Sequence, residues 1–98
     1  MGERFQLTGE MWRHPSAAAW HFLTIPEIAS AEIRVRFGMM SRGFGSLRVE
    51  VTIGDTRWRT SIFYDRTMNG YLLPVKAAVR KAAGLTDGDQ VQFVVQVL

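Results

Sequence analysis

The chain has 98 residues, of which 47% are hydrophobic and 21% are charged. This length supports one hydrophobic core, and we expect a single domain over residues 1–98. Cysteine is absent from the sequence, which excludes disulfides, thiol catalysis and thiolate metal sites. The 12 basic and 9 acidic residues give a net charge of +3. Because these charges are scattered, they indicate a solvated surface rather than a charged interaction tail.

A membrane location is not indicated by the sequence. A spanning helix needs about 18 consecutive apolar residues, and no such run occurs. The first residues also lack the apolar segment of a secretory signal. Together with the lack of cysteine, this predicts a cytoplasmic protein without membrane contact.

The first predicted strand begins near the N-terminus. Phe5 and Leu7 alternate with polar residues, which is the pattern of a half-buried strand. We expect this strand to reach Trp12 and to be ended by His14-Pro15-Ser16, because proline and serine are typical of turns.

A second strand and a helix follow. Residues 19–25 carry apolar side chains in both alternating sets, which predicts a strand buried on both faces near the centre of the sheet. Pro26 needs no amide partner in the first turn of a helix and is therefore expected to start one. Glu27 in that first turn suits the helix dipole, and we expect the helix to end before Gly38.

The glycine-rich segment from residue 38 to 46 is predicted to be the most mobile loop of the chain. Gly43 and Gly45 would let backbone amides approach an anion, which makes their neighbours Arg42 and Ser46 candidate ligand-binding residues. The spacing is neither that of a Walker loop nor that of a dinucleotide fingerprint. The alternative is a loop that closes onto the fold, with Phe44 as its hydrophobic plug.

A β-hairpin is predicted around Gly54-Asp55, because apolar and polar residues alternate on both sides of this pair. In a two-residue loop of the type that requires glycine first, Val51 lies opposite Trp58, and the apolar side chains of both strands share one face. The same register places Glu50 opposite Arg59 on the other face. We therefore expect a structural role for Trp58 on the inner face, with Arg59 outside.

The last third of the chain predicts a strand, a helix, a turn and a closing strand. Pro74 is expected to start the helix, and Gly84 is expected to end it in a left-handed conformation. Asp87-Gly88 predicts the turn. The apolar stripe of this helix is formed by Val75, Ala78, Val79 and Ala82. The closing strand carries apolar side chains at Val91, Phe93, Val95 and Val97.

Three basic residues of this helix form the best candidate anion site. Lys76, Arg80 and Lys81 are expected near its start and on its outer face, where the amides of a helix N-terminus also favour an anion. The alternative interpretation is a solvated helix face. Together with Arg42 and Ser46, these are the predicted ligand-binding residues.

No metal-binding or catalytic constellation is indicated. His14 and His21 are the only histidines, and a zinc site needs three or four converging ligands. The serines at Ser41, Ser46 and Ser61 do not lie in a Gly-x-Ser-x-Gly nucleophile elbow. We expect neither a metal nor a cofactor.

A weak internal repeat links the two halves of the chain. Leu23-Thr24-Ile25-Pro26 leads into one predicted helix, and Tyr71-Leu72-Leu73-Pro74 leads into the other. This pattern predicts a pseudo-twofold fold in which the two strands occupy equivalent positions and each proline starts a helix.

Several short segments follow one another in a specific spacing: Trp20-His21-Phe22, Ile25-Pro26, Gly43-Phe44-Gly45-Ser46, Val49-Glu50-Val51-Thr52-Ile53-Gly54, Trp58-Arg59-Thr60-Ser61-Ile62-Phe63, Gly70-Tyr71-Leu72-Leu73-Pro74-Val75-Lys76, Val79-Arg80-Lys81-Ala82 and Gly88-Asp89. In combination they resemble the bacterial DUF1905 family over nearly the whole chain. Tyr64 stands where members of that family often carry proline. The resemblance implies a mainly β fold with two short helices, a double-split β-barrel like that of AbrB-like and MazE-like proteins, capped by helices. It implies no established activity.

Three functions remain open at this point. The first is a non-catalytic module that binds a small anionic ligand or a protein partner, as a monomer or weak homodimer. The second is an AbrB-like nucleic-acid-binding regulator, although scattered arginines predict no sequence-specific DNA binding at physiological salt. The third is an enzyme that uses an arginine, His21 or Tyr71 in a pocket. A basic stripe would favour the second function, and a cleft with converging polar groups would favour the first or third.

Overall fold

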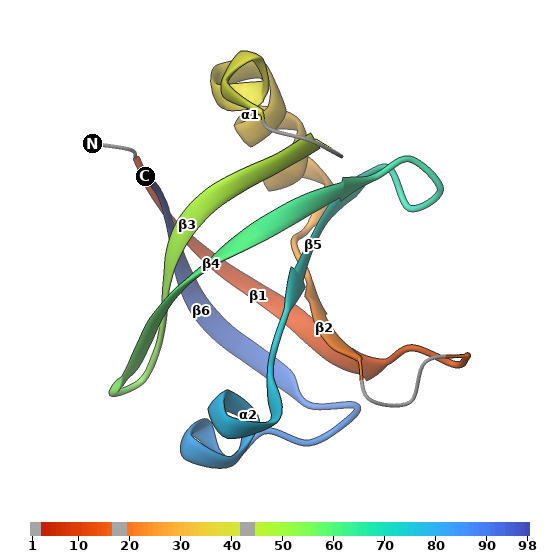
Figure 1. Ribbon diagram of the computed structural model, residues 1–98, viewed down its shortest axis with the longest axis vertical. Helices are drawn as coiled ribbons and strands as arrows, with labels where there is room; N and C mark the ends of the chain where they lie inside the picture. The colour runs from red at the N-terminus through yellow and green to blue at the C-terminus, as the bar shows by residue number, and fades with distance from the viewer. Residues whose placement is uncertain (1–2, 17–19, 42–44) are drawn as a thin grey trace.

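The computed structural model of the protein describes residues 3–16, 20–41 and 45–98. Within them lie β1 (Arg4–Arg13), β2 (His21–Thr24), α1 (Glu27–Phe37), a short 3-10 helix η1 (Gly38–Met40), β3 (Ser46–Ile53), β4 (Thr56–Asp65), β5 (Gly70–Pro74), α2 (Ala77–Ala83) and β6 (Gln90–Val97). The strands form a closed antiparallel barrel in the order β1-β2-β5-β4-β3-β6 (Figure 1). The expected mainly β barrel with two helices is therefore confirmed.

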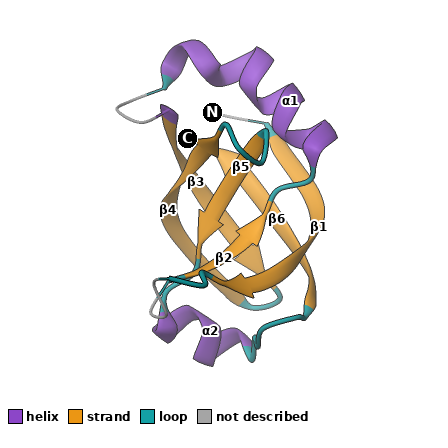
Figure 2. Cartoon of the chain, turned by 90° about the vertical axis from the view of Figure 1, so that its right-hand side faces the viewer, coloured by secondary structure: helices purple, strands orange, loops and turns teal. Residues whose placement is uncertain are grey.

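The two helices lie at opposite ends of this barrel, with α1 over one end and α2 over the other (Figure 2). Neither described helix has the length and the apolar character needed to cross a membrane. The helices lie at opposite ends because β2 and β5 run in opposite directions, and α1 follows β2 whereas α2 follows β5.

The barrel interior is filled by the alternating apolar residues of the strands. Val49 and Val51 of β3 and Val95 of β6 are fully buried, while their polar neighbours along each strand are more exposed. This confirms the alternation expected for the closing strand, whose buried residues are Val91, Phe93, Val95 and Val97. The first strand, predicted from Phe5 to Trp12, is also confirmed within a residue or two.

The predicted hairpin has the expected register. Val51 pairs with Trp58 and Glu50 pairs with Arg59 across β3 and β4. Gly54 has a φ of 55°, which is the left-handed conformation that the first position of this two-residue loop requires. Trp58 lies on the inner face, but its indole is only half-buried.

Helix α1 begins and ends where the sequence indicates. Pro26 is its N-cap and Gly38 its C-cap, and Glu27 lies in its first turn. Ser30 and Ile33 are its buried residues. They fix the face of the helix that covers the end of the barrel.

The prediction that Pro74 starts the second helix is wrong. Pro74 is the last residue of β5 and pairs with Phe22, and the N–H of Val75 still donates to the carbonyl of His21 at 2.8 Å. Lys76 is the N-cap of α2. The backbone stays extended because burial of Val75 and its pairing with β2 extend the strand past the proline.

The buried face of α2 also differs from the predicted apolar stripe. Val79 and Ala83 pack against the core as partly buried residues, whereas Ala78 and Ala82 are exposed. The predicted stripe is therefore wrong at both alanines. Gly84 ends the helix in the left-handed conformation, as predicted, with φ 68° and ψ 38°.

The predicted equivalence of the two prolines is wrong for the same reason, since only Pro26 caps a helix. The backbone pairing relates other positions. Ile25 N–H donates to the carbonyl of Tyr71, and Val75 N–H donates to the carbonyl of His21, on either side of the Leu23 and Leu73 pair. Around that pair, His21 corresponds to Tyr71 and Ile25 to Val75.

Two further expectations concern the loop and the exit from β4. Gly38–Met40 forms η1, whereas the predicted plug Phe44 and the candidate residue Arg42 lie outside the described residues. Tyr64 continues β4 and pairs with Tyr71 of β5. The strand therefore ends one residue after Tyr64, at Asp65.

Candidate functional site

A pocket of about 700 Å³ opens at the α1 end of the barrel. It is lined by Arg34, Gly38, Met39, Ser41, Gly45, Tyr64, Arg66 and Tyr71. We call it the tyrosine pocket. Two of these described lining residues are arginines and none is acidic, so the pocket favours an anion.

Its two tyrosines are brought together by the pairing of β4 with β5. Tyr64 lies opposite Tyr71, and the rings meet edge to face with centroids 5.2 Å apart. Edge-to-face contact is a favoured geometry for aromatic pairs. The Tyr71 side chain is held deep in the fold, since the residue is only 1% exposed.

Ser30 fixes α1 above these rings. Its hydroxyl donates to the carbonyl of Ile25 at 3.1 Å and accepts the N–H of Tyr71 at 2.9 Å. Gly70 leaves room for this link, because a Cβ there would lie 3.1 Å from the Ser30 hydroxyl oxygen. The backbone beside Tyr71 is thereby bound to the helix that carries Arg34.

Arg34 lies one turn after Ser30 on α1, and therefore on the same side of the helix. Its guanidinium carbon is 3.9 Å from the centroid of the Tyr64 ring, within the range of a cation–π contact. Such a contact holds the guanidinium over the ring without neutralising its charge. Arg34 can thus still attract an anion into the pocket.

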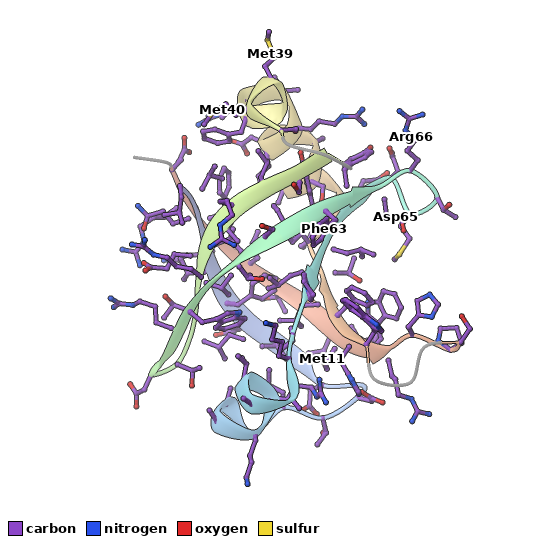
Figure 3. The ribbon with its side chains drawn as sticks, viewed as in Figure 1. Met11, Met39, Met40, Phe63, Asp65 and Arg66 are labelled. Carbon is purple, nitrogen blue, oxygen red and sulfur yellow. The ribbon has the colours of Figure 1, made fainter. Side chains whose placement is uncertain are left out.

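The turn between β4 and β5 closes the other side. The Tyr64 hydroxyl donates to Oδ1 of Asn69 at 2.6 Å, and Nδ2 of Asn69 donates to Glu27 at 3.4 Å. Asn69 adopts a φ of 54°, a conformation that asparagine tolerates better than most residues. Arg66 projects from this turn beside Asp65 (Figure 3), and it is the second cation of the lining.

Burial raises the pKa of the Tyr71 phenol above its usual value of 10.0. The charge of Arg34 lowers this pKa, Tyr64 raises it, and a side-chain hydrogen bond with Ser41 lowers it, but burial has the largest effect. The phenol is therefore neutral at physiological pH and can donate a hydrogen bond to a bound ligand.

Among the residues that the structure describes, no three His, Cys, Asp or Glu side chains lie together in a way that could hold a metal ion. Nε2 of His21 lies 3.3 Å from Asp87, near α2 rather than in the tyrosine pocket. Among the residues considered for an enzyme, Tyr71 lies in the tyrosine pocket together with Arg34, whereas His21 lies outside it.

The three predicted basic residues of the second helix have different environments. Lys76 and Lys81 are exposed. Arg80 is half-buried, and its guanidinium donates to the carbonyl of Val75 at 2.7 Å. Arg80 is thus already bonded to the backbone just before the helix.

Ser46 lies apart from the three basic residues of α2. It opens β3 opposite Phe63, next to Gly45 of the tyrosine pocket, at the α1 end of the barrel. The fifth predicted residue, Arg42, lies outside the described residues. The described members of the predicted ligand-binding set therefore divide between the two ends of the barrel.

Sequence reasoning did not select Arg34, Tyr64 or Arg66, and it named Tyr71 only as one option for an enzyme. A partial signal was present. Asn69-Gly70 indicates a turn at this point of the chain. The register that sets Tyr64 opposite Tyr71 depends on the longer connection, residues 66–69, which this pair alone does not specify. The position of Arg34 above them depends on how α1 packs, which local sequence does not reveal.

A second hollow, of about 610 Å³, lies between β4 and the junction of β5 with α2. We call it the edge groove. Trp20, Trp58 and Phe63 supply aromatic rings to it, and Arg48, Arg59 and Lys76 supply positive charge. Lys76 is the one predicted ligand-binding residue in its described lining, which also includes His21, one of the residues considered for an enzyme.

The sequence model of one family, described as a domain of unknown function (DUF1905), matches residues 8–95. This range takes in the whole barrel except the two ends of the chain. No curated protein matches the chain. By the extent of that match, the chain belongs to the DUF1905 family.

Proposed function

We propose that this domain binds a small anionic ligand, one with a carboxylate or phosphate group, in the tyrosine pocket. The observation that carries the proposal is the convergence of Arg34, Arg66 and the buried Tyr71 in one hollow whose described lining contains no acidic residue. In this arrangement the arginines neutralise the ligand charge, and the phenol donates a hydrogen bond to one of its oxygens.

The availability of the arginine charges supports this role. Arg34 rests on an aromatic ring rather than on a carboxylate. Arg36, two residues later on the same helix, instead forms ion pairs with Glu3 and Glu32. Its charge is therefore already neutralised by protein groups, whereas that of Arg34 is available to a ligand.

Binding fits the pocket better than catalysis does. General acid–base catalysis works best with a group that titrates near the operating pH. The described lining offers no histidine or carboxylic acid, and burial moves the pKa of Tyr71 further above neutrality. A neutral phenol in a pocket lined by two arginines suits recognition of an anion.

The double-split organisation of the barrel is part of the proposal. It is supported by the pairing of β2 with β5 and by the helix that follows each of these strands, with α1 and α2 at opposite ends of the barrel. A nucleic-acid-binding role is the alternative for such a fold, but fold likeness is a weak argument for function. We expect no sequence-specific DNA binding; a gel shift that survives about 200 mM salt and prefers one sequence would favour the regulator instead.

The test is a titration of the whole chain with inorganic phosphate and with benzoate, followed by amide chemical shifts in NMR spectra. We expect saturable shifts at Ser41, Arg66 and Tyr71. Because a hydrogen bond to a charged group contributes about 1.5–3 kcal/mol, Arg34→Gln and Tyr71→Phe should each weaken binding by about tenfold or more.

The matched control is Arg36→Gln, which removes the same charge from the same helix outside the pocket. It should change the affinity by less than about threefold, because only long-range electrostatics is altered. Equal losses for Arg34→Gln and Arg36→Gln would reduce the effect to general charge attraction and contradict the proposed site. If only Arg34→Gln weakens binding, native mass spectrometry of protein purified gently from its host would identify the ligand that the pocket retains.

A further inference from the structure

The edge groove contains a stretch of β4 that pairs with β3 on one side and with no strand on the other side. On one side, β3 pairs with β4 from Thr56 to Phe63, whereas on the other side β5 pairs with β4 only at Phe63–Asp65. Among the residues that the structure describes, none forms a ladder with the other edge of β4 before Phe63. A strand edge of this kind is a template for another strand.

The hairpin register identifies the backbone groups that face the groove. A two-residue loop makes Ile53 and Thr56 a hydrogen-bonded pair, and such pairs recur at every second residue of an antiparallel ladder. The backbones of Trp58 and Thr60 therefore face β3, and those of Arg59 and Ser61 face the other way. Arg59 and Ser61 both line the edge groove.

The side chains around this edge define what would bind there. Positive charge comes from Arg48, Arg59 and Lys76, and no acidic residue is among the described lining. Two carboxylates just outside the lining compensate part of that charge: Glu50 lies 3.5 Å from Nε of Arg59, and Asp87 lies 3.3 Å from Nε2 of His21. The groove thus carries a net positive field that favours an acidic partner.

Aromatic rings supply the apolar part of the surface. Trp20 is 56% exposed and Phe63 is 39% exposed, and Phe63 lies on β4 (Figure 3). Trp58 is half-buried and faces inward from the same strand. A strand placed beside β4 would bring alternate side chains to the inner face near Trp58 and to the outer face near Arg59.

We propose that the edge groove binds an extended segment of a partner protein as an added strand on β4, with acidic side chains alternating with apolar ones. Its main chain pairs with Arg59 and Ser61. Its acidic side chains meet Arg48, Arg59 and Lys76, and its apolar side chains cover Trp58. A nucleic acid would satisfy the charges and rings of this surface but would leave the amides and carbonyls of the strand edge unpaired, so we favour the peptide.

The first experiment uses a fluorescein-labelled heptapeptide that alternates glutamate with valine, and follows its anisotropy as the full chain is added. We expect saturable binding. The same peptide with N-methyl groups on the amides of one edge should bind about tenfold more weakly or worse, because it cannot donate to β4. Equal binding of the two peptides, or absence of saturable binding, would overturn the proposal.

The second experiment is amide hydrogen exchange of the wild-type chain, which needs no variant to fold. Without peptide the amides of Arg59 and Ser61 should exchange quickly for a barrel strand, and the heptapeptide should slow both by about tenfold or more. Slow exchange that depends on protein concentration alone would assign the groove to a second copy of this chain. If a thymidine oligonucleotide slowed the exchange of both amides and the peptide did not, the groove would be assigned to nucleic acid. Either result would overturn the proposal.

A pair of charge reversals separates the groove from general electrostatics. Lys76→Glu lies in the groove, whereas Lys81→Glu changes an exposed lysine on the last turn of α2, outside the described lining. The first should weaken the heptapeptide by about tenfold and the second by less than about threefold. Equal losses for the two variants would contradict the site. Arg34→Gln in the tyrosine pocket should leave peptide binding unchanged, which keeps this test independent of the proposed ligand site.

Discussion

The two ends of the barrel are closed in different ways. At one end, α1 has 11 residues and buries Ser30 and Ile33. At the other end, α2 has 7 residues and no buried residue of its own. There the core is covered by residues that are only partly buried: Trp58, Val79, Ala83 and Leu85.

This difference decides what the arginines of each helix can do. Helix α1 is attached through the short side chain of Ser30, so Arg34 can lie over Tyr64 beside an open pocket. Helix α2 uses Arg80 for a similar attachment, and that guanidinium is bonded to the carbonyl of Val75. A positive charge near a helix end therefore indicates a ligand site only after its bonds to the protein itself are known.

The comparison is tested most severely by Ile33→Ala. Removing this fully buried side chain should destabilise the domain by about 2–5 kcal/mol, because it opens a cavity under α1. The matched control is Val35→Ala on the same helix, where the side chain is 86% exposed and the change should stay within about 0.5 kcal/mol. Urea unfolding measures both, and similar midpoints for the two variants would show that α1 is not docked through Ile33.

The cover of the α2 end is tested by Trp58→Ala. Truncation of a buried tryptophan costs about 3–5 kcal/mol, and half burial should lower this to about 2–3 kcal/mol. Arg59→Ala, on the outer face of the same strand, should cost no more than about 1 kcal/mol, since its pair with Glu50 is an exposed one. A larger loss for Arg59→Ala in parallel urea melts would mean that the register of β4 is inverted.

The two attachments can be compared directly. Ser30→Ala leaves the buried N–H of Tyr71 without its partner and should cost about 1–3 kcal/mol. Arg80→Met keeps most of the apolar stem and removes one part-buried hydrogen bond, so about 0.5–1.5 kcal/mol is expected. If thermal or urea unfolding ranks Arg80→Met as the more damaging change, α2 and not α1 is the more firmly attached helix.

The smallest effect concerns alkaline pH. Because burial raises the pKa of Tyr71 above 10.0 in the folded state, the unfolded chain loses this proton first as the pH rises. The contribution of Tyr71 to stability is therefore complete below pH 10.0 and is lost as the pH rises through the folded-state pKa. Urea unfolding on both sides of this pH should show the decline in wild type, and Tyr71→Phe should reduce it. An unchanged decline in the variant would assign the alkaline sensitivity to other groups.

The hairpin and the closing strand are features that the local sequence predicts correctly. The position of Gly54 and the alternation on both sides specify one register, because a slip of one residue would move the apolar side chains to the wrong face. The end of α2 at Gly84 is also local, since the left-handed residue that closes a helix is usually glycine. In these places neighbouring residues supply the deciding interactions.

Pro74 and the tyrosine pocket show where the sequence is insufficient. A proline after an apolar run is compatible with a helix start, but pairing with Phe22 keeps Pro74 in a strand. Likewise, Arg34 and Tyr71 become neighbours in one pocket only when Ser30 binds the backbone beside Tyr71.

The sequence by itself determined the closing strand, the hairpin register, the bounds of α1 and the end of α2, because these depend on alternation and on turn residues. The strand expected over residues 19–25 with both faces buried was wrong in part, since β2 spans His21–Thr24, Leu23 is its one buried residue and Trp20 is 56% exposed. The tertiary structure alone decided the start of α2 and the composition of the pocket, because both depend on contacts between segments that lie far apart along the chain.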